Sequence, residues 1–236
     1  MRVLIIDQCS GTKDFPDDLP VADQEWTGRA DQNEILSSLD IDGIQARDLY
    51  NGKQQQRIGE AVQVLKTNDH DVTRYFLSAG FGAVAADVRL PPYEATFNKM
   101  TKDEIEERSN KFGLTERIKT LIENNDYDIV FFALGMKYYD AFDLRGVLSA
   151  MPTKTTVVLF NQEEIEDDYE NVVSIPARTE QGKKYGSSVI GLKGTYLKYF
   201  AAAIGDDEAP ILPSEAAEYC LTSPSGGSQS DIDRYS

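Results

Sequence analysis

The sequence predicts an α/β fold of three layers, αβα, with a central and mostly parallel sheet of four to five strands. Short apolar segments alternate with segments of helical periodicity along the 236 residues, which is the pattern of βαβ units. The apolar segments alternate little between polar and apolar residues, as strands covered on both faces do. We therefore expect parallel strands joined by right-handed crossovers, with helices on both faces of the sheet.

Five strands are expected, and each is short and bounded by turn or helix signals. In chain order they are Val3–Ile6, Tyr75–Ala79, Asp128–Leu134, Thr155–Phe160 and Asn171–Ile175. The expected helices are Ile58–Lys66, Lys102–Asn124 with a break near Gly113, and Gly194–Ala203. Apolar residues recur at helical spacing in the first helix, and charges of both signs give the second a solvated face.

The chain length fits one domain with an elaboration. We expect residues 1–222 to form a single α/β domain with an insertion at residues 14–45. This insertion is acidic and rich in turn residues, has Trp26 in its middle, and is interpreted as a lid. Residues 223–236 are rich in serine and glycine, as linkers are, so we expect a disordered tail.

Composition excludes several classes of protein. The formal net charge of −16 argues against nonspecific attraction to nucleic acid, although it is compatible with a local basic groove. The single histidine, His70, rules out a multi-histidine metal site, and the distant Cys9 and Cys220 make neither a zinc site nor a disulfide framework. No apolar run is long enough to span a membrane and the N-terminus has no secretory signal, so we expect a cytoplasmic protein.

No cofactor and no metal are expected. Gly80, Gly82 and Ala85 loosely match a dinucleotide fingerprint, but the pair Pro91-Pro92 follows soon after, where a helix should run. The pair Gly182-Lys183 lacks the upstream glycine and the following hydroxyl of a phosphate-binding P-loop.

The loops after the expected strands carry many polar and aromatic side chains. In an open α/β sheet the ligand binds beyond the carboxyl ends of the strands. The loop Asp7–Lys13 offers a carboxylate, a hydroxyl and an ammonium, and the segment Ala46–Gly52 adds further candidates. Phe81 lies between Gly80 and Gly82, so we expect that it does not pack like a mid-strand residue and instead stacks on a base, which is worth about 1–3 kcal/mol.

The segment Arg178–Lys198 is locally basic in an otherwise acidic chain. Its cations are Arg178, Lys183, Lys184, Lys193 and Lys198, against the lone acid Glu180. Gly186, Ser187 and Ser188 precede the helix expected there, and backbone amides together with lysines suit a phosphate. A solvated loop and helix face accounts for the same residues.

Short motifs in these loops resemble one known family. The motifs are Cys-Ser-x-x-Lys (Cys9, Ser10, Lys13), Asp48-Leu49-Tyr50, Leu77-Ser78-Ala79 followed by Gly82 and Pro92-Tyr93, and the Leu-Gly ending of Phe132–Gly135. In order and spacing, across residues 1–205, they resemble the uracil-DNA-glycosylase-like superfamily. The nearest branch is the one typified by the glycosylase-like domain of archaeosine synthase. Two motifs of the well-known DNA enzymes are missing, since Ser174–Arg178 has no histidine and the first loop has no Gln-Asp-Pro-Tyr.

The resemblance implies a DNA glycosylase-like hydrolase that cleaves the N-glycosidic bond of a modified base and leaves an abasic site. DNA containing modified bases is the implied partner, and defence against phages with altered DNA is the role suggested by analogy. Such cleavage needs a carboxylate near the cationic sugar, donors for the departing base and a stacking platform. The implied catalytic residues are Asp48, Asp7, Ser10 and Lys13; the implied base-binding residues are Tyr50, Ser78, Phe81 and Tyr93; and the implied phosphate-binding or DNA-binding residues are Arg178, Lys183, Lys184 and Ser187.

Two other functions fit the sequence. An enzyme acting on free nucleosides, nucleotides or RNA suits the acidic composition, and a noncatalytic nucleic-acid-binding or nucleotide-binding module suits the missing histidine. Structural roles also fit individual residues, because Asp7 can cap a turn, Lys13 can be solvated and Asp48 can N-cap a helix. The glycosylase interpretation requires Ser10, Asp48 and Phe81 to lie around one opening. The base, the strandedness of the substrate and the oligomeric state stay open.

Overall fold

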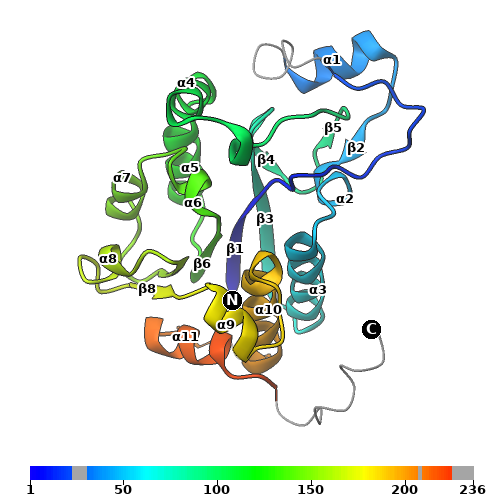
Figure 1. Cartoon of the computed structure of the whole chain (residues 1–236). Coiled ribbons are helices and arrows are strands. Elements are labelled where there is room, and N and C mark those ends of the chain that lie inside the picture. Colours follow the sequence, from blue (N-terminus) through cyan, green and yellow to red (C-terminus); the bar gives the residue numbers. More distant parts are fainter. Residues whose placement is uncertain (23–30, 207–208, 225–236) are drawn as a thin grey trace.

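The computed structural model describes residues 1–22, 31–206 and 209–224, and Figure 1 shows their arrangement. The expected three-layer αβα fold is confirmed, because helices cover both faces of a central sheet. In spatial order the strands are β4 (Gly82–Ala85), β3 (Asp71–Ser78), β1 (Arg2–Gln8), β6 (Ile129–Ala133), β7 (Thr156–Phe160) and β8 (Val172–Ile175). All neighbours are parallel except β4, which runs antiparallel to β3.

Strand β1 lies in the middle of the sheet and faces two separate apolar layers. Val3 lies opposite Val72 of β3 and opposite Ile129 of β6. Because side chains alternate along a strand, Val3 and Ile5 join one layer whereas Leu4 joins the other. The first layer is covered by α3 (Lys53–Thr67), α10 (Val189–Ile204) and α11 (Pro213–Leu221). The second is covered by α4 (Lys102–Phe112), α5 (Leu114–Glu123) and α7 (Leu144–Ser149).

Smaller elements surround this core. The short helices are α1 (Gln32–Leu39), α2 (Ala46–Leu49), α6 (Met136–Tyr139), α8 (Glu163–Glu166), α9 (Thr179–Lys184) and the single 3₁₀ turn η1 (Phe97–Lys99). Strand β2 (Ile44–Gln45) pairs antiparallel with β5 (Arg89–Leu90). In Figure 1, α1, β2 and β5 lie together on the side of the sheet that carries β4.

All five expected strands and all three expected helices are present, with shifted ends. The expected break in the second helix falls at Gly113, whose φ of +59° forms a left-handed cap at the end of α4. The sheet has six strands rather than four to five, because Gly82–Ala85 folds back onto β3 after a turn in which Gly82 has a φ of +76°. Helix α10 begins earlier than expected, because its glycines pack closely against α3.

The expected insertion contains α1 and β2, whereas Trp26 and the rest of residues 23–30 lie outside the described residues. The expected tail also lies outside them from residue 225 onward. Among the described residues, no helix combines the length and the apolar character needed to cross a membrane. Cys9 and Cys220 are both buried as free thiols.

Candidate functional site

The carboxyl ends of β1 and β6 form the topological switch point of the sheet. The chain leaves β1 toward α3 and β3 on one side, and it leaves β6 toward α7 and β7 on the other. In open α/β sheets, ligands bind in the crevice between neighbouring strands whose connections diverge in this way. Here the Gly135 N–H donates to Gln8 Oε1 at 2.7 Å and ties the two strand ends together.

Three hydroxyl-bearing residues, Tyr50, Ser78 and Tyr93, meet at the carboxyl end of β3, and we refer to them as the hydroxyl cluster. All three are fully buried. The Tyr50 hydroxyl donates to Ser78 Oγ at 3.1 Å and lies 2.6 Å from the Tyr93 hydroxyl, which lies 2.8 Å from Ser78 Oγ. Burial raises the pKa of Tyr50 and of Tyr93 well above the usual range, so both phenols stay protonated.

Tyr138 of α6 extends this polar region toward the loop after β1. Its hydroxyl lies 3.1 Å from Cys9 Sγ and 3.1 Å from Thr96 Oγ1, and it donates to the Cys9 carbonyl at 3.0 Å. Phe97 packs edge-to-face on the Tyr138 ring, with ring centroids 5.3 Å apart. Burial also raises the pKa of Tyr138. The loops after β1 and β6 and the segment before α4 therefore meet in one place.

Lys13 joins the loop after β1 to the segment that follows Tyr93. Lys13 is only 8% exposed, and its ammonium donates to the Ser10 carbonyl at 3.0 Å and to the Ala95 carbonyl at 2.6 Å. The ammonium also lies 4.6 Å from the centroid of the Tyr93 ring, in the range of a cation–π contact. Burial lowers the pKa of Lys13, and nearby acidic groups act in the opposite direction. The alternative of a solvated Lys13 is therefore wrong.

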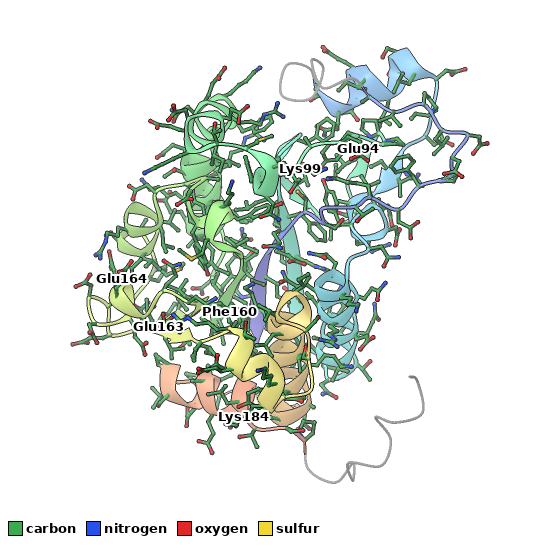
Figure 2. The ribbon with its side chains drawn as sticks, viewed as in Figure 1. Glu94, Lys99, Phe160, Glu163, Glu164 and Lys184 are labelled. Atoms are coloured by element: carbon green, nitrogen blue, oxygen red, sulfur yellow. The ribbon has the colours of Figure 1, made fainter. Side chains whose placement is uncertain are left out.

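Ser10 and Glu94 lie beside Lys13. The Ser10 hydroxyl donates to the Thr12 carbonyl. Glu94 is exposed, and its carboxylate is close enough to raise the pKa of Lys13. Figure 2 shows Glu94 and Lys99 near one another in the upper part of the molecule. Nothing in the sequence around Glu94 predicts a role for it, because a single acid in a loop carries no signal for the direction it faces.

Phe81 does not form the exposed stacking platform that the sequence predicts. It is 5% exposed and packs edge-to-face against Tyr93, with ring centroids 5.0 Å apart. Its glycine neighbours make this packing feasible: a Cβ on Gly80 would lie 2.6 Å from the Tyr93 ring, and Gly82 adopts a positive φ. The expectation that Phe81, flanked by glycines, stays out of the packing that a mid-strand residue has is wrong, because the missing side chains of the glycines leave room for both rings.

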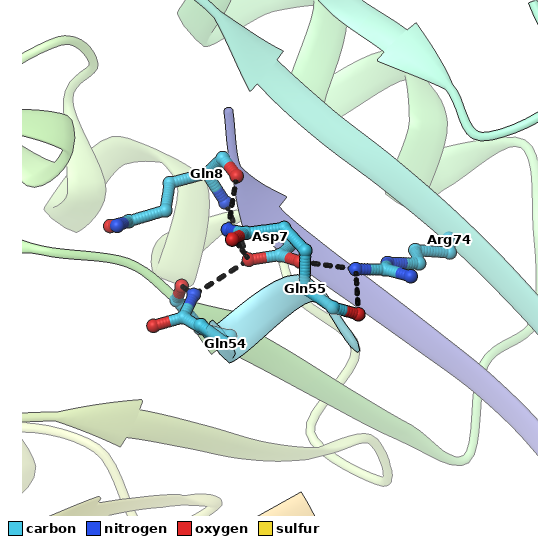
Figure 3. Close-up of polar contacts among 6 residues, drawn as sticks. Asp7, Gln8, Gln54, Gln55 and Arg74 are labelled. Carbon is cyan, nitrogen blue, oxygen red and sulfur yellow. Dashed lines mark hydrogen bonds and ion pairs between the residues drawn. The ribbon is translucent and has the colours of Figure 1, made fainter. Parts of the chain in front are cut away.

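Asp7 lies on the face of the sheet covered by α3, in the network shown in Figure 3. It is fully buried. Arg74 Nη2 donates to Oδ2 at 2.6 Å, while Gln54 Nε2 and the Gln8 N–H donate to Oδ1 at 2.7 and 2.8 Å. Burial raises the pKa of Asp7, and the Arg74 guanidinium is the strongest opposing influence. Asp7 therefore caps its own turn and neutralises Arg74, which leaves it no free position for activating water.

Asp48 does not share an opening with Ser10 and Phe81, so that expectation is wrong. Asp48 is exposed and lines a depression of about 600 Å³ between α3 and the β3–β4 edge of the sheet. The neighbouring Tyr50 points the other way, into the core. The reason is the helical turn of α2, which ends at Leu49 with Tyr50 as its C-cap, since positions two apart around such a turn face nearly opposite directions. Asp48 is also no N-cap, because Gln45 holds that position.

The predicted phosphate-binding residues Arg178, Lys183, Lys184 and Ser187 lie in and around α9, after β8. Arg178 pairs with Glu163 at 2.8 Å, and both side chains are exposed. Ser187 Oγ accepts a hydrogen bond from Arg57 of α3. In Figure 2, Lys184 lies far below Glu94 and Lys99. These cations are therefore separate from the hydroxyl cluster.

No protein-family model matches the chain, and no curated protein matches it. Within the described ranges, no group of three or more His, Cys, Asp or Glu side chains could hold a metal ion. The region beyond the ends of β1, β3 and β6 thus combines protonated phenols, a buried ammonium and an exposed carboxylate.

Proposed function

We propose that the chain is a DNA glycosylase-type hydrolase that removes a modified base from DNA and leaves an abasic site. The observation that carries the proposal is the meeting of Lys13, Glu94 and the hydroxyl cluster beyond the carboxyl ends of β1 and β3. These residues come from loops whose motifs resemble the uracil-DNA-glycosylase-like superfamily. The edge of the sheet on which they lie is the usual ligand site of open α/β folds.

The chemistry needs a negative group for water and the cationic sugar, and donors for the departing base. The requirement that Asp48 lie at the same opening as Ser10 and Phe81 fails, so the proposal depends on a different carboxylate. We assign the first role to Glu94, because Glu94 is exposed near Lys13 whereas Asp48 faces away. Water adds to the anomeric carbon and gives its proton to Glu94, while the electron pair of the C–N bond leaves with the base. The Lys13 ammonium balances the negative charge on that base, and the phenols of the hydroxyl cluster donate hydrogen bonds to it.

Access to this region requires two segments to separate. The Ala22 N–H donates to the Pro92 carbonyl at 2.7 Å, and Lys13 donates to the Ala95 carbonyl. Segment 13–22 therefore lies against segment 92–95, which carries the fully buried Tyr93. In our proposal a base extruded from the duplex, at a cost of a few kcal/mol, displaces this contact and reaches the phenols.

The decisive experiment scores abasic sites after incubation of the protein with unmodified and with modified phage DNA. We expect product only from DNA that carries the modified base, and the absence of product from every substrate would exclude base excision.

Two carboxylate variants test the assignment of Glu94. We expect Glu94→Gln to slow excision by about 10²–10⁴-fold, the usual contribution of a general base. Asp48→Asn is the matched control, because it removes an exposed carboxylate outside the proposed site, and it should keep the wild-type rate. Circular dichroism verifies that both variants fold. Equal rates for the two variants would contradict the role of Glu94.

A second candidate is an enzyme that cleaves free nucleosides or nucleotides. The net charge of −16 favours it, because a small substrate needs no wide basic groove. Release of free base from a panel of nucleotides, without any abasic product from DNA, would select this function. Nucleic-acid binding without either product would indicate the noncatalytic module.

The proposed biological role is defence against phages with modified DNA. On cells that express the protein, phages with modified DNA should then form fewer plaques than phages with unmodified DNA do. Cells that express Glu94→Gln should lose this protection.

A further inference from the structure

Lys193 is a buried cation at the switch point that the proposed function does not use. It shares the sheet-facing side of α10 with Leu197, Phe200 and Ile204, all buried. Phe200 packs on Phe131 of β6. Lys193 precedes Phe200 by two helical turns, about 10 Å, which corresponds to about three residues of a strand. The Lys193 side chain therefore lies at the carboxyl end of β6.

The burial of Lys193 is not compensated by a direct partner. Lys193 is 7% exposed, and within the described part of the chain its ammonium makes no hydrogen bond or ion pair. Burial lowers its pKa, and the charge of Asp7 opposes this effect from a distance. Asp7 is already paired with Arg74, so one carboxylate faces two cations. One positive charge is thus left over on a largely buried side chain, where removing a charge from water is costly. Among the described residues, Lys193 Nζ is not one of the fully buried atoms that lack a partner, so a ligand can approach it from solvent.

Gln54 presents an unused acceptor in the same region. Its Nε2 donates to Asp7 Oδ1 and to the Ala133 carbonyl at the end of β6, which fixes the amide orientation. Its Oε1 is buried and has no hydrogen-bond partner among the described residues. Gly194, the residue after Lys193, lets α10 approach here, because a Cβ on it would lie 2.8 Å from the Gln54 carbonyl.

Two helices begin at this place. Gln54 lies in the first turn of α3, and Lys193 lies in the second turn of α10. The N-terminus of a helix carries a partial positive charge and favours an anion. A ligand that fits must therefore carry negative charge, accept a hydrogen bond from the Lys193 ammonium and donate one from a hydroxyl to Gln54 Oε1.

We propose that Lys193 and Gln54 form a binding site for a phosphate group that retains a hydroxyl, either inorganic phosphate or a phosphate monoester. Lys193 donates to a charged phosphate oxygen, and Gln54 Oε1 accepts from the P–OH group. A phosphodiester has no such hydroxyl and is excluded. This site requires no base excision, so it can be tested whether or not the proposed function holds.

The test compares wild type with Lys193→Met and Lys198→Met in urea denaturation, with inorganic phosphate or with chloride at equal ionic strength. Lys198 is the matched control, since it lies on the same helix but is 44% exposed and paired with Glu60. We expect phosphate to raise the urea midpoint of wild type and of Lys198→Met, and to leave that of Lys193→Met unchanged. Calorimetry should show phosphate affinity at least tenfold weaker in Lys193→Met.

In chloride, Lys193→Met should unfold at a higher urea concentration than wild type, because methionine keeps the apolar stem without a buried charge. A lower midpoint, or a variant that does not fold, would show that Lys193 is a structural partner of Asp7 and would overturn the site. Absence of any phosphate effect on wild type, or an equal effect on Lys193→Met, would overturn it too.

A measurement on the wild-type protein avoids substitutions altogether. Acetic anhydride labels lysines, and peptide mass spectrometry reads the labelling of Lys193 and Lys198 separately. Inorganic phosphate should protect Lys193 at least fivefold and leave Lys198 unaffected, whereas dimethyl phosphate should protect neither. Labelling of Lys193 that phosphate does not change would overturn the proposal.

Discussion

Replacement of Arg74 by methionine tests whether the ion pair at the end of β1 holds the switch point together. Asp7 is fully buried, the Arg74 side chain is 7% exposed, and 2.6 Å separates Arg74 Nη2 from Asp7 Oδ2. Methionine fills part of the same volume but leaves the carboxylate without its counter-charge. Removing one partner of a buried pair costs about 3–5 kcal/mol. We therefore expect Arg74→Met to lower the free energy of unfolding at pH 7 by this amount.

The matched control is Arg145→Met. Arg145 pairs with Asp168 at the surface, where the two side chains are 55% and 50% exposed, and such pairs contribute about 0–1 kcal/mol. Urea denaturation followed by circular dichroism measures both variants. A loss in Arg74→Met no larger than that in Arg145→Met would refute the role assigned to the buried pair.

The loss in Arg74→Met should also grow with pH. Burial raises the pKa of Asp7 above its usual 3.8, and Arg74 is the main opposing influence that the variant removes. An acid whose pKa is raised by folding stabilises the fold below its unfolded pKa, and this contribution is lost as the pH rises through the folded pKa. Between the two values stability falls by about 1.4 kcal/mol per pH unit. Arg74→Met should therefore recover part of its deficit from pH 7 to pH 5, and a constant deficit would contradict the mechanism.

Three further substitutions and titrations follow from the site. Gly80→Ala should lower the free energy of unfolding by about 1–3 kcal/mol through overpacking, because a Cβ at this position would lie 2.6 Å from the Tyr93 ring. Gly11→Ala is the neutral control, because a Cβ there would have nothing within 4 Å. Equal urea midpoints of the two variants would contradict this prediction. Ser78→Ala should lower the free energy of unfolding by about 1–3 kcal/mol, because Ser78 Oγ forms hydrogen bonds with two phenols and accepts from the N–H groups of Gly80 and Phe81. Ser149 is an exposed serine. A loss smaller than that in Ser149→Ala would argue against the network. Above pH 10 the phenols whose pKa is raised by burial should ionise only as the protein unfolds, since an acid with a raised folded pKa loses its stabilising effect as the pH rises toward that value. Ionisation of all twelve tyrosines, measured by absorbance at 295 nm, before the circular dichroism changes would refute this. These phenols are Tyr50, Tyr93, Tyr127, Tyr138, Tyr139 and Tyr196.

The fold could be predicted where a strand is buried on both faces, because such a strand has an unbroken run of apolar residues. Ile129–Ala133 is buried at every position and reads as an unbroken apolar run. Strand β4 could not be predicted in this way, because Gly82–Ala85 is short and made of small residues. Its place depends on pairing with the edge of β3, which is a tertiary contact.

The sequence predicts which loops meet at the candidate site, but it does not predict which side chains face one another there. The carboxyl ends of parallel strands share one edge, so the motifs around Lys13 and Tyr93 could be expected to meet. The direction of Asp48 depends on the phase of one short helical turn, which a sequence motif does not specify. The sequence does not predict the buried position of Arg74 either, because a charged residue in or beside a strand is usually taken to face solvent. Only the fold shows that the Arg74 guanidinium reaches Asp7.

The middle position of β1 has a consequence for how the chain is made. Its partners are synthesised much later, since Arg2 pairs with Asp71 and Val3 with Ile129. Translation adds about 5–20 residues per second, so many seconds pass before both edges of this apolar strand are covered. A nascent chain that pauses ahead of β6 exposes one edge of β1 to other chains. The strand order therefore leaves β1 open to pairing with other chains during part of translation, whatever the stability of the finished fold.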